Sequence, residues 1–183
     1  MVQYAVPTGD ISDGTWVTDG GGSDLSAQVD SGIIGGTSDD ATYITENGDF
    51  FPAECDLALS GLSDPSDHND HVLRIRARHD GGLNSSFYTL AYNLYQGASL
   101  IAGFNANPSD GLSTTWTTFS GTLSTSEASG ISDYTALSVR LQANTFNTAD
   151  AVRVSEVELE VPDAGGGGGE GPKLNPEFFL ALL

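Results

Sequence analysis

Short stretches in which apolar and polar residues alternate constrain the fold of this chain more than any other feature. In Val72–Arg78, the residues Leu73, Ile75 and Ala77 are apolar, and the three residues that follow them in turn are arginines. Leu137–Ala143 alternates in the same way. Because successive side chains of a strand point to opposite faces of a sheet, this period predicts β-strands with one buried face.

Eight further segments have a strand-like composition, and turn pairs such as Asp-Gly and Asn-Gly separate them. About ten short strands predict an all-β fold, a two-sheet antiparallel jelly-roll-like sandwich with an extended C-terminal arm. No helix of normal length is expected in the body. The eight segments are Thr15–Asp19, Leu25–Asp30, Ala41–Thr45, Cys55–Ser60, Phe87–Tyr95, Ser99–Phe104, Trp116–Leu123 and Ala151–Val161.

Two local patterns add detail to this prediction. In the last strand, Val152 and Val154 share one parity, whereas Val157 and the apolar residues after it share the other. A shift of one residue predicts a β-bulge or a change of sheet environment. Ser124 and Glu127 have the spacing of a capping box, which predicts one helical turn there.

Two predicted strands carry charged residues at the same spacing. If these strands are neighbours, cross-strand pairs form on the outer face, each contributing roughly 0.2–1 kcal/mol. The alternative is a stripe of arginines that docks an anion or a partner. The residues are Arg74, Arg76 and Arg78 on one strand, and Glu156, Glu158 and Glu160 on the other.

The charge of the chain is strongly acidic, with 6 Lys+Arg against 25 Asp+Glu and a net charge of -19. Such a field repels nucleic acid, so no nucleic-acid partner is expected. Cys55, the single cysteine, is expected to be a small buried hydrophobe. The first residues have no basic region and no apolar core, and no segment reaches the length of a spanning helix. We therefore expect synthesis in the cytoplasm and no membrane partner.

One loop combines carboxylates and imidazoles just before the arginine-rich strand. Asp64, Asp67 and Asp70 are weak candidates for a calcium site, and His68 and His71 are potential transition-metal ligands. The spacing matches neither an EF-hand nor a zinc motif, which favours a solvated loop. No nucleophile elbow or other catalytic constellation stands out. An enzyme is not expected, and neither is a cofactor.

Aromatic residues offer a further possibility, because flat rings stack on the faces of sugars. Tyr88 and Tyr92 share the parity of neighbouring leucines, which favours a buried strand face over a ligand platform. Trp116 and Phe119 lie on opposite parities, so at least one of them is a candidate for exposure. The aromatic candidates as a group are Trp16, Tyr88, Tyr92, Tyr95 and Trp116.

A run of five glycines separates the strand-rich body from an apolar end. We divide the chain into an N-terminal extended segment (1–14), a sandwich domain (15–163), a Gly-rich linker (164–172) and an apolar anchoring tail (173–183). Apolar residues at the end of a flexible tether predict a partner surface that receives them. The docking candidates are Leu174, Phe178, Phe179, Leu180, Leu182 and Leu183.

Several short motifs follow one another in a distinctive order between Thr15 and Pro162. They are Asp39-Asp40-Ala-Thr-Tyr43-Ile44, Leu57-Ala-Leu59 with Asp64-Pro65, His71–Arg76, Tyr95-Gln-Gly97 with Ile101-Ala102, Ile131–Leu137 and Val154–Pro162. This order resembles a jelly-roll-type β-sandwich of tailed-bacteriophage virion structural proteins. Related sandwiches are similar to carbohydrate-binding modules. The resemblance implies a fold and a virion context, and it supplies no functional residues.

Two functional hypotheses result. The first is a non-enzymatic bacteriophage virion protein, either head decoration or fibre-type or tail-associated, whose sandwich is displayed on the particle. Its C-terminal arm would dock on a capsid, portal or tail protein, so its location would be the virion. The alternative is a carbohydrate-binding-module-like protein that recognises host-surface or extracellular glycans. Copy number and the presence of a homo-oligomer are left open by both.

Overall fold

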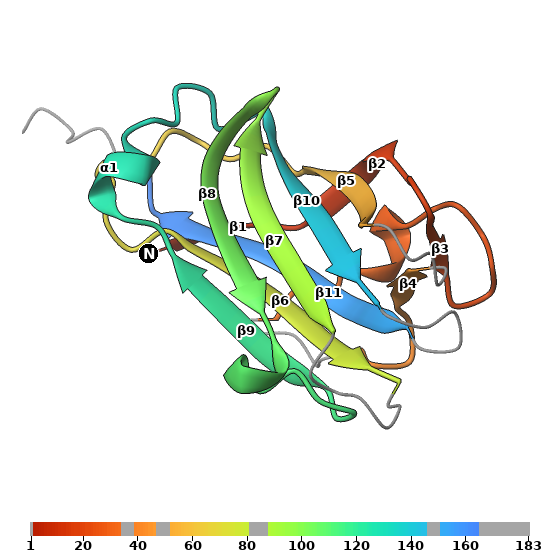
Figure 1. The fold of residues 1–183 in the computed structure, drawn as a ribbon. Helices are drawn as coiled ribbons and strands as arrows, with labels where there is room; N and C mark the ends of the chain where they lie inside the picture. Colours follow the sequence, from red (N-terminus) through yellow and green to blue (C-terminus); the bar gives the residue numbers. More distant parts are fainter. Residues whose placement is uncertain (1, 34–38, 47–51, 81–87, 146–150, 165–183) are drawn as a thin grey trace, which may run out of the picture.

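Two antiparallel sheets packed face to face make up the computed structural model, which describes residues 2–33, 39–46, 52–80, 88–145 and 151–164 (Figure 1). The six-stranded sheet has the order β3-β4-β11-β6-β9, and β1 also pairs with β11. Its strands are β1 (Val2–Ala5), β3 (Trp16–Thr18), β4 (Ile44–Glu46), β6 (Val72–His79), β9 (Thr117–Thr122) and β11 (Val152–Pro162).

The five-stranded sheet has the order β2-β5-β10-β7-β8, again with antiparallel neighbours. Its strands are β2 (Pro7–Ser12), β5 (Ala53–Leu59), β7 (Thr89–Gln96), β8 (Ser99–Ala106) and β10 (Leu137–Asn144). The predicted all-β sandwich is thereby confirmed. The helical elements within the described residues are short: α1 (Thr125–Ala128) and 3-10 turns at Ser26–Gln28 and Pro108–Asp110.

Two parts of the strand prediction were wrong. We expected strands from Thr15 onward, but β1 and β2 precede that residue and pair with β11 and β5. Leu25–Asp30 was expected to be a strand and instead contains a 3-10 turn. Asp10 caps this turn, since its carboxylate accepts hydrogen bonds from the Leu25 and Ser26 amides at 2.8 and 2.7 Å. Leu25 and Val29, on either side of the turn, are both buried in the core.

Both local predictions are confirmed. The register between β11 and β6 shifts between Val154 and Glu156, which is the irregularity that the change of parity indicated. At α1, the Ser124 hydroxyl accepts from the Glu127 amide, and the Glu127 carboxylate accepts from the Ser124 amide at 2.7 Å. The parity change therefore marks a real change of register within one strand.

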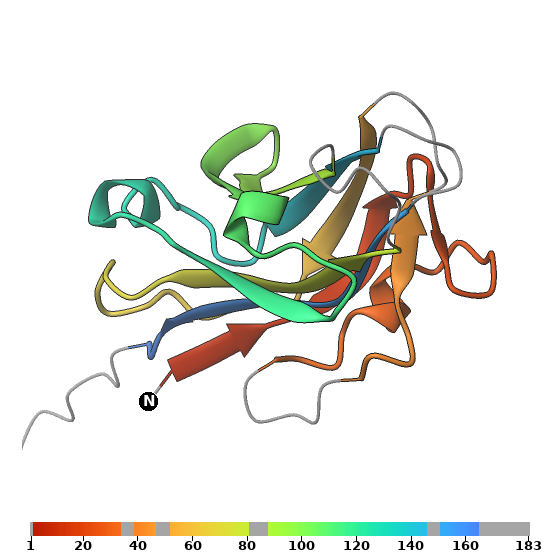
Figure 2. The same ribbon diagram turned by 60° about the horizontal axis from the view of Figure 1, so that its bottom comes forward.

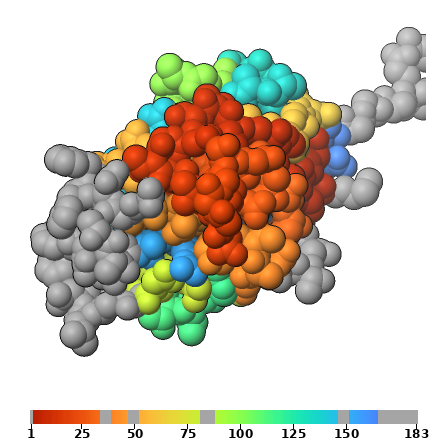
Figure 3. All heavy atoms as spheres, turned by 90° about the vertical axis from the view of Figure 1, so that its right-hand side faces the viewer, coloured from red at the N-terminus to blue at the C-terminus, as the bar shows by residue number. Residues whose placement is uncertain are grey.

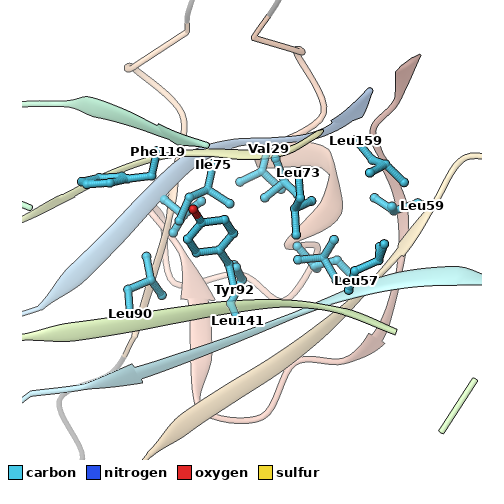
Figure 4. Close-up of a cluster of buried hydrophobic side chains, with 14 of the residues drawn as sticks. Val29, Leu57, Leu59, Leu73, Ile75, Leu90, Tyr92, Phe119, Leu141 and Leu159 are labelled. Atoms are coloured by element: carbon cyan, nitrogen blue, oxygen red, sulfur yellow. The ribbon is translucent and has the colours of Figure 1, made fainter. Parts of the chain in front are cut away.

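The core fills the space between the sheets with aliphatic and aromatic side chains. Figure 4 shows Leu73, Ile75 and Phe119 of the six-stranded sheet pointing toward Leu90 and Tyr92 of the five-stranded sheet. These positions have the inward parity of their strands, and all are buried. Cys55 is buried among them, and this burial raises the pKa of its thiol.

The outer side of β11, in the six-stranded sheet, is covered by other parts of the chain. In Figure 2, part of the orange segment that leads into β4 passes on the outer side of β11, and in Figure 3 red and orange residues make up much of one end of the molecule. Glu156 and Glu158 on β11 point outward, as predicted, yet they are 0% and 1% exposed. The Asp39 amide donates to Glu156 at 2.8 Å, and the Ile33 amide donates to Glu158 at 2.9 Å.

The two sheets meet closely where β8 faces β9. A Cβ atom added to Gly121 of β9 would lie 2.2 Å from the ring of Phe104 of β8, so the glycine makes room for that ring. The contact holds one edge of the sandwich together, because Phe104 also packs against Tyr92 with ring centroids 5.5 Å apart.

We predict that Gly121→Ala lowers the free energy of unfolding by about 1–3 kcal/mol, because the added methyl group overpacks the Phe104 ring. Urea denaturation measures this change. Gly20→Ala is the matched control, since nothing lies within 4 Å of a Cβ there. Combining Gly121→Ala with Phe104→Leu should recover part of the loss. Equal stability of Gly121→Ala and the wild-type protein would contradict this account of the contact.

Candidate functional site: the open face of the five-stranded sheet

We call the outward side of β5, β10, β7 and β8 the open face, because most of its outward side chains are partly or fully exposed. In Figure 1, β10, β7 and β8 lie in front of β6 and β11, and no described segment crosses in front of them. Strand pairing aligns the outward residues in three rows across β8, β7, β10 and β5. The rows are Leu100, Tyr95, Ser138 and Ala58; Gly103, Asn93, Arg140 and Asp56; and Asn105, Ala91, Gln142 and Glu54.

Tyr95, Arg140 and Asp56 form the centre of the open face. The guanidinium carbon of Arg140 lies 4.5 Å from the centroid of the Tyr95 ring, which is a cation–π contact. Nε and Nη2 of Arg140 each donate to one carboxylate oxygen of Asp56 at 2.8 Å. This bidentate pair holds the pKa of Arg140 above its usual range and fixes the guanidinium against the ring.

Small residues leave space between the larger side chains of the open face. Gly103 has no Cβ, and the Asn93 amide oxygen lies 2.7 Å from where that atom would be, so Asn93 leans across β8. Ala91 and Ser138 are similarly short neighbours of Gln142 and Tyr95. The result is a mainly polar surface on which amide, guanidinium and carboxylate groups lie near one half-buried ring.

The aromatic candidates from the sequence divide clearly. Trp16, Tyr88 and Tyr92 are buried in the core, each 2% exposed, so they are not part of any platform. Tyr95 and Trp116 are partly exposed, whereas Phe119 is buried. The sequence placed Tyr95 in one group with aromatic residues that are buried, and it did not single out Asn93 or Gln142 as binding residues. Both residues alternate with buried leucines, and this outward parity is the signal that could have identified them.

The arginine-rich strand lies beside the glutamate-rich strand, as the matched spacing suggested. Arg76 of β6 is opposite Glu156, and Arg74 is opposite Glu158. Arg74 forms ion pairs with Glu158 at 3.6 Å and Glu160 at 2.6 Å. Arg78 pairs with Asp80 at 3.7 Å. The three arginines therefore have carboxylate partners of their own chain.

Arg76 has a carboxylate partner that the strand pattern did not indicate. Its Nε and Nη2 atoms donate to the two oxygens of Asp40, both at 2.7 Å, and Ser155 also donates to Asp40. These hydrogen bonds, with that from Arg76 the strongest influence, hold the pKa of Asp40 below its usual range. Asp40 thereby fastens the covering segment to β6.

The acidic loop before β6 does not form a metal site in the described residues, where no group of three potential ligands lies close enough together. Asp64, Asp67 and Asp70 are exposed, and Asp67 accepts a hydrogen bond from the Asn69 amide. His71 is buried and its Nε2 lies 2.7 Å from the Tyr134 hydroxyl. The loop thus has a structural arrangement built on local hydrogen bonds.

The anchoring tail predicted from sequence lies outside the described residues, together with nearly all of the Gly-rich linker. This applies to every docking candidate: Leu174, Phe178, Phe179, Leu180, Leu182 and Leu183. Within the described residues, no helix is both long enough and apolar enough to cross a bilayer.

Comparisons with known proteins give distant likenesses. No protein-family model matches the chain, and no curated protein matches it either. Among solved structures, the xylan-binding module CBM15 aligns over 87% of this chain and 97% of its own, with 11% identity and a TM-score of 0.47. The C-terminal CBM6 of LamC, a marine laminarinase from Zobellia galactanivorans, aligns over 88% and 99%, with 12% identity and a TM-score of 0.42.

The K3 cleaved adhesin domain of Lys-gingipain from Porphyromonas gingivalis w83 aligns over 85% of this chain and 98% of its own, with 11% identity and a TM-score of 0.40. Identities and TM-scores of this size assign the chain to none of these groups. A function is therefore inferred from the side chains of the open face.

The Asp40–Arg76 pair generates a prediction about pH. Because the folded-state pKa of Asp40 is lowered, its ionised form stabilises the fold at neutral pH, and this contribution is lost as pH falls below about 4. Asp40→Asn should therefore reduce stability at pH 7 by on the order of 1 kcal/mol, since the pair is partly exposed. Urea denaturation should show a smaller difference in the free energy of unfolding between the variant and the wild type at pH 3 than at pH 7. An equal difference at both pH values would contradict this role of Asp40.

Proposed function

We propose that this protein is a non-catalytic glycan-binding module and that the open face is its binding surface. The observation that carries the proposal is the Tyr95–Arg140–Asp56 arrangement on an exposed, mainly polar sheet face. Tyr95 supplies an aromatic ring against which the apolar face of a pyranose packs. Arg140 and Asp56 supply a planar donor and acceptor set beside it.

The chemistry of the open face suits a sugar because sugars combine apolar ring faces with many hydroxyl groups. The Asn93 and Gln142 side chains each offer a donor and an acceptor, as a hydroxyl group requires. The Arg140 guanidinium is already fixed by Asp56, so little side-chain entropy is lost when a ligand binds. The rows run across four strands, which supports recognition of a chain of sugars rather than a single ring.

The preferred glycan is a neutral one. The chain carries a net charge of -19, and a field of this sign repels polymers that carry carboxylate or sulfate groups. In the open face, the positive charge of Arg140 is already balanced by Asp56. We therefore expect neutral polysaccharides to bind more strongly than polyuronates of similar length.

The test is Tyr95→Ala. Removing an aromatic contact of about 1.5–3 kcal/mol should weaken binding by roughly 10- to 100-fold, whereas Tyr95→Phe should retain most of the affinity. Affinity electrophoresis in gels containing soluble β-glucan, xylan, mannan or polyuronate measures the effect. Tyr4→Ala is the matched control, because Tyr4 is 39% exposed on β1 of the other sheet. Retardation of Tyr95→Ala equal to that of wild type would contradict the proposal.

A second proposal concerns the apolar end of the chain, whose sequence motivates display on a bacteriophage particle. The proposed docking residues end with Leu182 and Leu183, beyond the glycine run. This role does not conflict with glycan binding, since a displayed sandwich would present its open face to host-surface glycans. Attachment to a capsid, portal or tail protein remains a prediction.

Deletion of Lys173–Leu183 tests the attachment. The truncated protein should fold, bind the same glycans as the full chain and fail to join particles, because the apolar contacts with a virion partner are lost. Incorporation into particles is measured after complementation of a phage that lacks the full-length protein. Normal incorporation of the truncated protein would exclude the tail as the anchor.

A further inference from the structure

A second group of aromatic and charged side chains lies on the opposite side of the sandwich from the open face. We call it the Tyr43–Trp116 cluster, and its members are Tyr43, Arg78, Asp80, Trp116 and Arg153. They come from segments that are distant in the sequence and that the six-stranded sheet brings together. Arg153 of β11 is opposite Thr45 of β4 on one side and Arg78 of β6 on the other.

The two rings of the cluster are each held by a guanidinium group. Arg78 lies over the Trp116 ring at 5.0 Å from its centroid, and Arg153 lies over the Tyr43 ring at 4.5 Å. The ring centroids of Tyr43 and Trp116 are 5.9 Å apart with an interplanar angle of 52°. These contacts fix the orientation of both rings without burying either of them completely.

Asp80 connects the two arginines. Its carboxylate pairs with Arg153 at 2.5 Å and with Arg78 at 3.7 Å. Arg153 also donates to the Tyr43 hydroxyl at 2.8 Å. Hydrogen bonding to Asp19, followed by burial, raises the pKa of Tyr43, so the phenol stays neutral at physiological pH. The cluster is therefore a fixed set of rings, donors and acceptors in which the two arginines share the Asp80 carboxylate and the Tyr43 hydroxyl contacts a second carboxylate, that of Asp19.

The cluster also retains access to solvent. The side chains of Arg78, Arg153 and Asp80 are 27%, 23% and 25% exposed. Trp116, one of the two tryptophans of the chain, is partly exposed, whereas Trp16 is buried and donates its indole N–H to the Ala53 carbonyl. A tryptophan that stays at the surface, beside a second ring and paired polar groups, has the composition of a small-ligand contact surface.

We propose that the Tyr43–Trp116 cluster is a second binding site for neutral glycans, and that one molecule can bridge two polysaccharide chains. This inference depends on the proposed function of the open face. The two sites face away from each other because they occupy the outer sides of opposite sheets. A single glycan chain that follows one sheet does not reach the other site, so the two sites engage different chains or distant parts of one chain.

Bridging has a consequence that a single site does not produce. Two outward-facing sites in one molecule cross-link long polysaccharides into a network, because a polymer with many binding segments is held by several protein molecules at once. Short oligosaccharides occupy both sites without forming a network. The ratio of bound oligosaccharide to protein and the ability to cross-link are therefore separate measurements.

The experiment uses the full chain and the neutral polysaccharide that most strongly retards the wild-type protein in the affinity electrophoresis described above. Isothermal titration with a short oligosaccharide of that polymer should give two sites for the wild type and one for Trp116→Ala or Tyr95→Ala. Turbidity of the long polymer should rise with wild-type protein and be lost in each single variant. Tyr43→Ala serves as a second variant of the cluster, and circular dichroism checks that each variant folds. Tyr4→Ala should behave as wild type.

The outcomes separate this inference from the proposed function. Absence of binding to every polysaccharide would overturn both. Binding that Tyr95→Ala weakens, with one site in the wild type and no effect of Trp116→Ala or Tyr43→Ala, would overturn the second site alone. Cross-linking that arises from a dimer with one site per chain would also overturn it, and sedimentation velocity identifies that case.

Discussion

The rest of the structure depends on the burial of β11 on both of its faces. Its inner valine and leucine side chains enter the core, and its outward Glu156 and Glu158 are also inaccessible to solvent. A buried carboxylate without partners is strongly destabilising, so these two residues require cations and amide donors around them. The arginines of β6 and the amides of Ile33 and Asp39 meet that requirement.

This requirement makes the two sheets functionally unequal. On the six-stranded sheet, Ile33, Asp39 and Asp40 contact the outward side chains of β11 and β6, so the charged residues there are largely partners of one another. The five-stranded sheet carries no buried acidic pair on its outer side and needs no cover from the described chain. Its open face can therefore present Tyr95, Arg140 and their neighbours to a ligand. The Tyr43–Trp116 cluster lies on the outer side of the six-stranded sheet, where its side chains stay partly exposed.

The strands with strong apolar–polar alternation could be predicted from sequence alone, because their alternation matches the buried and outward sides of the sheets. The alternation in Val72–Arg78 and Leu137–Ala143 corresponds to β6 and β10, and the parity change after Val154 corresponds to the bulge. Residues before Thr15 lack such alternation, so β1 and β2 were missed; their pairing with β11 and β5 is tertiary. Leu25–Asp30 was misassigned because capping by the distant Asp10 favours a turn there.

The candidate sites were less predictable because they depend on contacts between distant segments. The Arg–Glu spacing indicated neighbouring strands, but Asp40 and Asp80 lie just outside strands and their pairing with arginines has no local signal. Tyr43 was not among the aromatic candidates, because its contacts with Arg153 and Trp116 also join distant segments. Trp116 and Tyr95 were among the aromatic candidates. The sequence did not distinguish these two partly exposed residues from Trp16, Tyr88 and Tyr92, which are buried.

The most direct test of the central claim is an NMR titration of the ¹⁵N-labelled protein with a neutral oligosaccharide from the polymer that binds in electrophoresis. The account predicts chemical-shift changes at the backbone amides of Asn93, Tyr95 and Arg140, across adjacent strands β7 and β10 of the open face. An oligosaccharide that binds and leaves these three amides unchanged would contradict the assignment of the open face as the glycan-binding surface.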